Sequence, residues 1–319
     1  MKFEWQYTGS QPRKLRAALK HEGVSASLIK VAVYQGGKMQ INGEDRWTVD
    51  LVNPGDYFSL ILPPEKPNDN VIPSNLPIQI VYEDRDFLIL NKPAGVATVP
   101  AHHVTVADSL VNRVRNYYER QGYENLVIHV ATRLDKDTSG LVVFPKHRFA
   151  HAVMDQQLKK HQVKKNYYAV VGGQINTPHG YIDAPIDRDP EKFVSRTVIS
   201  TGKPSVTEYW LEKSSVQMSL LRIRLHTGRT HQIRVHFQYL GHPLIGDEMY
   251  GGKQIISRQA LHCYWMKFYS PFKQQWIEVH APVPEDMLNL INSFYLLNRL
   301  IRSVEHKQVQ DKQRPFVIR

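Results

Sequence analysis

The sequence predicts an α+β protein in which a mixed, mainly antiparallel sheet forms a large domain behind a small N-terminal α/β domain. From residue 78 onward, short apolar or alternating stretches recur with few helical patterns between them, among them FLILNKPAG, GLVVFPK, YYAVVGG and SLLRIRLHT. A stretch with five prolines, PPEKPNDNVIPSNLP, precedes them and has the composition of a semi-rigid linker. The expected division is therefore 1–62, a linker at 63–77, 78–302, and a loose basic tail at 303–319.

The first 62 residues carry the signals of two short helices and a hairpin. Ser10 and Pro12 stand where a helix cap and a first-turn proline would be, and RKLRAALKHEG follows them. A second helix is expected across Ser25–Tyr34, after which KMQING and YFSLIL read as strands. Five basic residues are expected along one side of this domain, either as a phosphate-binding face or as an ordinary solvated surface: Arg13, Lys14, Arg16, Lys20 and Lys38.

The large domain is expected to contain four helices, over Ala107–Arg120, Arg148–His161, Thr230–Leu240 and Glu285–Arg302. The tail beyond them mixes Lys, Arg and Gln with few apolar residues. It could contact RNA or could lack order.

Composition points to a polyanionic partner. The 319 residues include 41 Lys plus Arg against 30 Asp plus Glu, a formal charge of +11, and nucleic acid is the leading candidate. No stretch approaches the roughly 18 apolar residues of a membrane helix, and the first ten residues do not resemble a signal peptide. Cys263 is the single cysteine, which excludes an internal disulfide and is consistent with the cytoplasm; we expect it to serve packing.

Residues 129–144, HVATRLDKDTSGLVVF, are the most informative segment. Asp135 comes just before a Ser-Gly turn and an apolar strand, with Arg133 and Lys136 beside it. A carboxylate can serve as nucleophile or general base when its setting is well defined. From these residues alone, a structural ion pair at the end of a strand is an equally good interpretation.

Two further segments carry tyrosine or lysine in strands. In KKNYYAVVGG the alternation directs Tyr167 and Tyr168 to opposite faces, and such tyrosines more often belong to a core than to a site. In FLILNKPAG, Lys92 precedes a Pro-Gly turn and could merely cap a hairpin.

The segment 226–252 contains three histidines five residues apart, at 226, 231 and 236. This spacing does not place them on one helix face, and no paired cysteines or acidic ligands accompany them, so a metal site is disfavoured. The favoured interpretation is an anion-binding pocket made by a helix N-terminus at Thr230 together with Arg229 and Arg234.

Taken together, RLDKDTSG, KNYYAVVGG and HTGRTHQIRVH occur in the order and approximate separation found in RNA pseudouridine synthases of the RluA type, which residues 78–282 resemble. YEDRDFLILNKPAGVATVP is similar to the opening strand pair of that family. The N-terminal pattern resembles the RNA-binding module named after ribosomal protein S4, which many members of the family carry.

The resemblance implies roles for individual residues. Asp135 would be the catalytic aspartate, Tyr167 the active-site tyrosine and Arg234 the basic partner that keeps the aspartate ionised. Arg133 would help to hold the RNA open around an extracted nucleotide, and further RNA contacts are expected from Lys136, Arg229 and His231. The family usually has a histidine where this chain has Thr132. That departure leaves catalysis untouched but could change local RNA contacts.

The expected activity is site-specific isomerisation of uridine to pseudouridine in structured RNA, with the target base flipped into the site. Large-subunit ribosomal RNA is the favoured substrate and transfer RNA the alternative. No cofactor and no metal are expected, and the protein is expected to be a cytoplasmic monomer. Two other hypotheses remain: a non-catalytic RNA-binding or ribosome-assembly protein with the same fold, and a metal-dependent nuclease or deaminase. The sequence does not distinguish a covalent route from one through a glycal.

Overall fold

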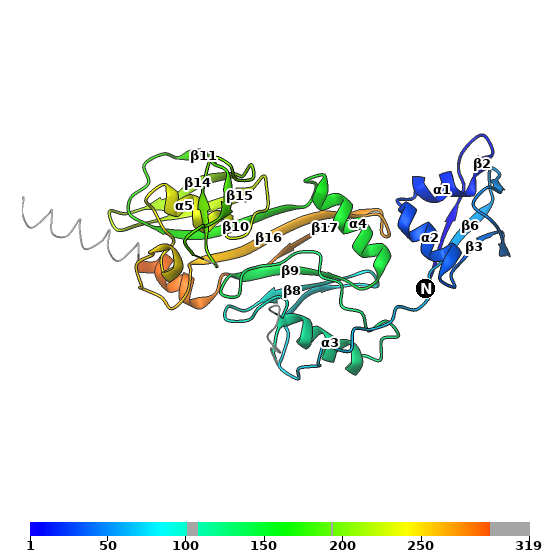
Figure 1. The fold of residues 1–319 in the computed structure, drawn as a ribbon, viewed down its shortest axis with the longest axis horizontal. Coiled ribbons are helices and arrows are strands. Elements are labelled where there is room, and N and C mark those ends of the chain that lie inside the picture. Colours follow the sequence, from blue (N-terminus) through cyan, green and yellow to red (C-terminus); the bar gives the residue numbers. More distant parts are fainter. Residues whose placement is uncertain (101–107, 193, 294–319) are drawn as a thin grey trace, which may run out of the picture.

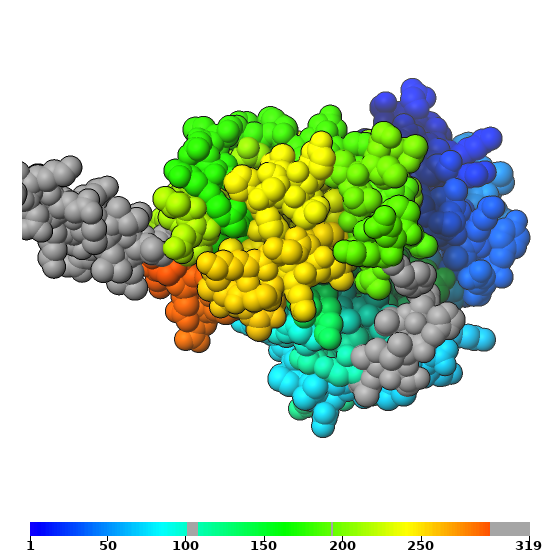
Figure 2. All heavy atoms as spheres, turned by 60° about the vertical axis from the view of Figure 1, so that its left-hand side comes forward, coloured from blue at the N-terminus to red at the C-terminus, as the bar shows by residue number. Residues whose placement is uncertain are grey.

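A computed structural model describes residues 1–100, 108–192 and 194–293. It consists of a small N-terminal domain and a larger part built on a long twisted sheet (Figure 1). In the space-filling view the N-terminal domain, in blue, lies at one side of the larger part (Figure 2). Among the described residues, no helix is both long and apolar enough to cross a bilayer.

The N-terminal domain is a four-stranded sheet with the order β1-β6-β3-β4, covered by two helices. Its strands are β1 (Lys2–Gln6), β3 (Lys38–Ile41), β4 (Glu44–Asp45) and β6 (Tyr57–Ile61). The helices are α1 (Leu15–His21) and α2 (Ala26–Tyr34). The hydroxyl of Ser25 caps α2 by accepting the Leu28 N–H at 3.2 Å, so the start predicted for this helix is confirmed.

The predicted start of the first helix is wrong. Arg13 and Lys14 form a short strand, β2 (Arg13–Lys14), that pairs with β5 (Leu51–Val52), and the helix begins only at Leu15. Pairing with a distant strand outweighs the local cap and proline signals. The sequence analysis also missed β1, because its partner, β6, lies more than fifty residues away.

The larger part is a nine-stranded mixed sheet with the order β11-β14-β15-β10-β16-β9-β8-β7, and β17 also pairs with β16. Only the β9–β16 pairing is parallel, so the sheet is mainly antiparallel as predicted. The strands are β7 (Ile80–Glu83), β8 (Phe87–Lys92), β9 (Ser139–Pro145), β10 (Lys164–Gly172), β11 (His179–Asp183), β14 (Val206–Ser214), β15 (Met218–Leu225), β16 (Leu261–Ser270) and β17 (Gln275–His280). A separate pair consists of β12 (Ile186–Arg188) and β13 (Arg196–Val198).

Helices cover both faces of this sheet. They are α3 (Leu110–Arg120), α4 (Arg148–Lys159), α5 (Gln232–Tyr239) and the 3-10 helix η1 (Glu248–Tyr250). Side chains of α4 and α5 join one core cluster and those of α3 join another. Strand β9 is buried along its whole length, as expected for a strand covered on both faces.

The other predicted helices are present with shifted ends. Helix α3, predicted to begin at Ala107, begins at Leu110, and Ser109 is its N-cap. Residue 107 itself lies outside the described residues. The helix predicted to begin at Glu285 is helical over 285–293, and its continuation and the predicted tail at 303–319 lie outside the described residues.

The proline-rich stretch 63–77, all of it described, contains neither helix nor strand but is fixed to the larger part. The carboxylate of Glu65 lies 3.1 Å from the ring of His129 and accepts the Arg148 N–H at 3.0 Å. Burial works against the charged carboxylate, yet the hydrogen bond and charge of His129 and the contacts of Arg148 outweigh it and lower the pKa of Glu65 to about 2.

We expect Glu65→Gln to lower the free energy of unfolding by about 1–3 kcal/mol at neutral pH, because a buried charged hydrogen-bond acceptor is lost. A lowered carboxylate pKa stabilises the fold above the unfolded value near 4.5 and stops doing so as pH falls towards 2. Urea unfolding at pH 7 and pH 3 should therefore show a smaller difference from wild type at pH 3. Glu44→Gln, which changes an exposed carboxylate, is the control. A difference of the same size at both pH values would contradict this role.

Candidate active site

Asp135 lies in the turn that leads into β9. Its carbonyl accepts the Thr138 N–H at 3.1 Å, which closes the turn. Its side chain remains 28 % exposed and its carboxylate accepts a hydrogen bond from Nη1 of Arg234 at 3.2 Å. The ion pair that the sequence left ambiguous is therefore present, and it faces an accessible cavity.

Lys92 stabilises this turn from the protein interior. Its ammonium is fully buried and donates to the carbonyls of Pro93, Val96 and Lys136 at 2.7–2.8 Å. Burial lowers the pKa of Lys92 to about 7, although the charges of Asp137 and Asp135 oppose that shift. Lys92 thus ties the end of β8 to the residue after Asp135, a role that is more than hairpin capping.

Arg234, on α5, connects two carboxylates. Besides Asp135, Arg234 binds Asp247 in a bidentate ion pair, through Nε at 2.7 Å and Nη2 at 2.9 Å. Asp247 is only 1 % exposed and Arg234 only 7 %. Burial disfavours the charged guanidinium, but the hydrogen bonds and charge of Asp247, with those of Asp135, raise its pKa.

The residues predicted from the sequence do not include Asp247. Tyr250, three residues later, was missed as well: its ring lies 4.9 Å from the guanidinium carbon of Arg234. The signal that could have found Asp247 is a single acidic residue in a Gly-Asp turn close to a functional arginine. Such a signal is weak without the fold.

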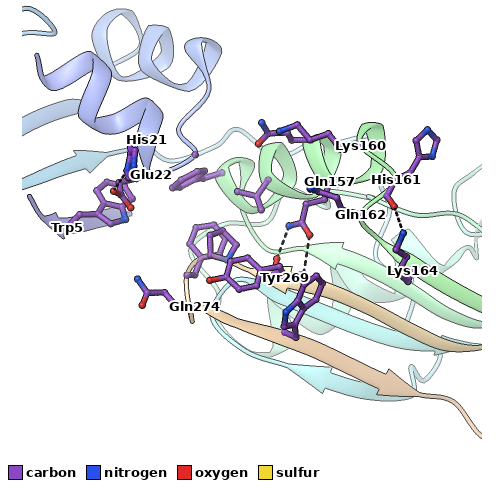
Figure 3. A pocket seen from close by; sticks show the side chains of 17 residues that line it. Trp5, His21, Glu22, Gln157, Lys160, His161, Gln162, Lys164, Tyr269 and Gln274 are labelled. Atoms are coloured by element: carbon purple, nitrogen blue, oxygen red, sulfur yellow. Dashed lines mark hydrogen bonds and ion pairs between the residues drawn. The ribbon is translucent and has the colours of Figure 1, made fainter. Parts of the chain in front are cut away.

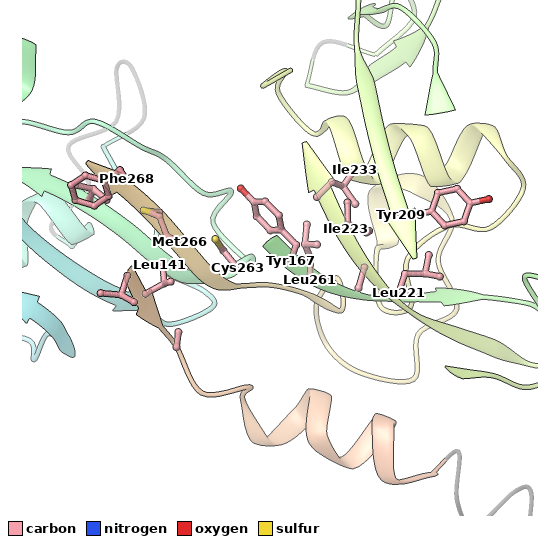
Figure 4. Close-up of a cluster of buried hydrophobic side chains, with 14 of the residues drawn as sticks. Leu141, Tyr167, Tyr209, Leu221, Ile223, Ile233, Leu261, Cys263, Met266 and Phe268 are labelled. Atoms are coloured by element: carbon pink, nitrogen blue, oxygen red, sulfur yellow. The ribbon is translucent and has the colours of Figure 1, made fainter. Parts of the chain in front are cut away.

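Tyr167 lies in β10 with its ring in the central core, opposite Cys263 on β16 (Figure 4). Tyr168 points to the other face and stacks on Tyr264 with ring centroids 4.0 Å apart. The structure therefore assigns the site-facing role to Tyr167. Burial, with smaller contributions from Cys263 and Asp135, raises the pKa of Tyr167 well above its usual value, so its phenol stays protonated at neutral pH.

A cavity of about 760 Å³ opens beside these residues, and we call it the catalytic cavity. Asp135 and Tyr167 line it together with the exposed Arg133, Lys136 and Arg229. A smaller recess of about 80 Å³ reaches inward to Arg234. The predicted residues of the site thus converge on one pocket, with the carboxylate inside and basic side chains at its rim.

His231 lies beside Asp135 in the inner recess. Its Nδ1 lies 2.9 Å from the hydroxyl of Tyr250 and its Nε2 lies 3.8 Å from the carboxylate of Asp135. Burial lowers the pKa of His231; the charge of Asp135 opposes that shift and Arg234 adds to it. The ring lines the inner recess, and its contact with RNA stays a prediction.

The predicted helix start at Thr230 is wrong, because α5 begins at Gln232 and His231 before it has a positive φ of 59°. The side-chain oxygen of Gln232 holds the preceding loop in place. It accepts hydrogen bonds from the backbone N–H of Arg229 and the hydroxyl of Thr227, both at 2.9 Å. Arg229 and Arg234 still line one recess together with Gln232 at the start of α5, and the binding of an anion there stays a prediction.

The three histidines go to separate partners. His226 binds Glu208 at 2.9 Å, while His236 is buried between the hydroxyl of Thr207 and the carbonyl of Ala184. Within the described residues no group of three or more His, Cys, Asp or Glu side chains is placed to hold a metal ion.

Thr132, where the sequence departs from its resemblance, is buried. Its hydroxyl accepts the Val143 N–H at 3.0 Å and so fastens the Asp135 segment to β9.

In the N-terminal domain all five expected basic residues are exposed, and Lys38 is paired with Asp45 at 2.7 Å. Contact of these five with RNA stays a prediction.

Comparison with known proteins identifies the family of this chain. Residues 86–239 match the family model of RNA pseudouridylate synthases. The chain is 39 % identical to the uncharacterized RNA pseudouridine synthase YjbO of Bacillus subtilis over 270 residues, which cover 84 % of this chain and 95 % of that protein. The chain belongs to the RNA pseudouridine synthases. It is an isomerase of RNA uridine, of the RluA type.

Further relatives and structures support the assignment. The Escherichia coli protein named ribosomal large subunit pseudouridine synthase D is 37 % identical over 240 residues, covering 69 % of this chain and 71 % of that protein. The human RNA pseudouridylate synthase domain containing 1 superposes with a TM-score of 0.55 at 23 % identity, covering 72 % of this chain and 98 % of that one. That likeness shows the shared fold.

We expect Asp247→Asn to reduce pseudouridine formation about 100-fold, because Arg234 would lose its charged anchor and shift relative to Asp135. The reduction should fall on kcat rather than KM, measured as tritium release from RNA labelled at uridine carbon five.

The matched control is Asp108→Asn, which changes a carboxylate that also holds an arginine, Arg113, through two hydrogen bonds but lines no part of the catalytic cavity. Equal activity losses in both variants, or an unchanged kcat in Asp247→Asn, would refute the positioning role of Asp247.

Proposed function

We propose that this pseudouridine synthase modifies a uridine of large-subunit ribosomal RNA. The observation that carries the proposal is the accessible carboxylate of Asp135, held by Arg234 in a cavity with basic side chains at its rim. The named substrate of relatives 36–37 % identical to this chain, from Haemophilus ducreyi and Escherichia coli, supports ribosomal RNA. The formal charge of +11 fits a large structured RNA.

In the proposed reaction the bond between uracil N1 and ribose C1′ breaks, the base turns, and a bond from C5 to C1′ forms. The C5 proton is lost and N1 takes up a proton, so no redox step is involved. The target nucleotide is flipped out of the RNA into the catalytic cavity, and Arg133 at the rim offsets part of the unstacking cost of a few kcal/mol.

Asp135 is the proposed catalytic residue, acting on the sugar or the base while the glycosidic bond breaks. Arg234 supports it by keeping a positive charge 3.2 Å from its carboxylate. Tyr167 lies against the uracil ring. Because its phenol is protonated at neutral pH, it serves by contact and hydrogen bonding and not as a base.

The N-terminal domain is the proposed second RNA contact, with the exposed basic residues of α1 and β2 facing the RNA backbone. Its two helices on a small sheet are consistent with an S4-like module. We further propose that the enzyme is a cytoplasmic monomer; the single, buried Cys263 supports the reducing compartment.

The decisive experiment compares pseudouridine maps of ribosomal and transfer RNA from cells with and without this gene. We expect one or more large-subunit positions to lose the modification, and to regain it with the wild-type gene but not with Asp135→Asn. Loss confined to transfer RNA would overturn the substrate assignment. Restoration by Asp135→Asn would overturn the role of Asp135.

Tyr167→Phe should keep at least a tenth of the wild-type rate, since the ring contact remains and no phenolate is needed. The wild-type rate should also stay nearly constant between pH 7 and 9, whereas a phenolate base with a raised pKa would require about a tenfold increase per pH unit. Initial rates across this pH range test both statements. A steep rise in wild type that Tyr167→Phe abolishes would show that the phenolate takes part.

A further inference from the structure

A second cavity, of about 620 Å³, lies between the N-terminal domain and the larger part; we call it the interdomain cavity (Figure 3). Trp5 and His21 line it from the N-terminal domain. From the larger part it is lined by α4, the start of β10 and the β16–β17 hairpin, which contributes Trp276. The mechanism described above does not use it.

The interdomain cavity combines exposed aromatic rings with positive charge. Trp276 is 56 % exposed and meets Tyr269 edge-on, with ring centroids 5.7 Å apart. Lys160 and Lys164 are exposed on its wall. Among its described lining residues the one acid is Glu22, which lies 3.1 Å from His21 of the same helix end. Rings that stack bases beside lysines that meet phosphates are the features that bind single-stranded nucleic acid.

The aromatic pair of Tyr269 and Trp276 is held in place by α4. The amide of Gln157 donates to the carbonyl of Tyr269 at 2.7 Å and accepts the Tyr269 N–H at 3.1 Å. Phe149 and Val153 of the same helix form a buried floor. The hairpin thus presents its rings from a fixed support, which reduces the ordering cost of binding.

The two cavities are continuous in their lining. His161, at the end of α4, and Lys164, at the start of β10, line both the interdomain cavity and the catalytic cavity. On the interdomain side of these residues, the lining also includes Lys160 and Trp276. Two cavities that share a basic wall fit one continuous polyanion better than two unrelated ligands.

We propose that the interdomain cavity binds a nucleotide of the substrate RNA that flanks the target uridine, its base on Trp276 and its phosphate beside Lys160 and Lys164. The inference rests on the proposed function, since it takes RNA as the ligand. It makes the N-terminal domain and the catalytic part act on one stretch of RNA. The volume is within the range of small-ligand pockets and suits a nucleotide.

Fluorescence anisotropy with labelled oligouridylates of three and twelve nucleotides tests this directly. On this proposal a trimer occupies the catalytic cavity alone, whereas a dodecamer is long enough to occupy the interdomain cavity as well. We expect Trp276→Ala to weaken dodecamer binding at least five-fold, since one base stack contributes about 1–3 kcal/mol, a factor of about 5 to 150. Trimer binding should stay within two-fold, and Trp276→Phe should restore most of the dodecamer affinity.

Lys160→Ala should reduce the slope of log Kd against log salt for the dodecamer by about 0.7, the effect of one phosphate contact on a single strand. Tyr239→Ala is the matched control for Trp276→Ala and should leave dodecamer binding unchanged, since Tyr239 is an aromatic residue, 59 % exposed, that lines neither cavity. Thermal unfolding of each variant shows whether it is folded before binding is measured.

Equal dodecamer affinity in wild type and Trp276→Ala would overturn the proposal. So would a wild type that binds dodecamer and trimer alike, an outcome that would point to a protein or small-molecule occupant. These binding measurements need no catalysis. Failure of the proposed function would instead be seen as missing tritium release or an unchanged pseudouridine map.

Discussion

The buried guanidinium of Arg234 between Asp135 and Asp247 is the interaction on which the site depends. A buried positive charge is costly unless it is paired and hydrogen-bonded, and Asp247 supplies that pairing with two bonds. With Arg234 fixed in this way, its remaining prong meets a carboxylate that stays accessible to substrate. Asp247 therefore serves the stability of the arginine, and Asp135 is left for the chemistry.

The sheet provides the rigid frame for this arrangement. The Asp135 turn is tied to β8 by Lys92 and to β9 by Thr132, and Tyr167 is set in the core of β10 opposite β16. These supports are buried, whereas the carboxylate of Asp135 stays accessible. The rim, in contrast, consists of exposed basic side chains, of which Arg229 donates to the carbonyl of Pro204 at 3.2 Å.

The small domain is more than an appendage on a linker. Phe3 meets Phe149 of α4 with ring centroids 5.0 Å apart, and Glu65 fastens the connecting stretch. The same helix, α4, supports the catalytic part on one side and receives the N-terminal domain on the other. The N-terminal domain is thereby packed directly against the helix that supports the catalytic part.

The sequence by itself determined the mainly antiparallel sheet and the order of its motifs, because alternation and short motifs are local properties. The roles of Asp135, Tyr167 and Arg234 were predicted from the resemblance of those motifs to RNA pseudouridine synthases. Only the tertiary structure decided that Asp135 pairs with Arg234, that His231 turns inward, and that Asp247 anchors Arg234. The observed starts of α1 and α5 also differ from the predicted ones, because pairing with a distant strand and hydrogen bonds to the side chain of Gln232 outweigh the local signals. Each of these features depends on contacts between segments far apart in the chain, and local pattern carries no information about which buried charge meets which.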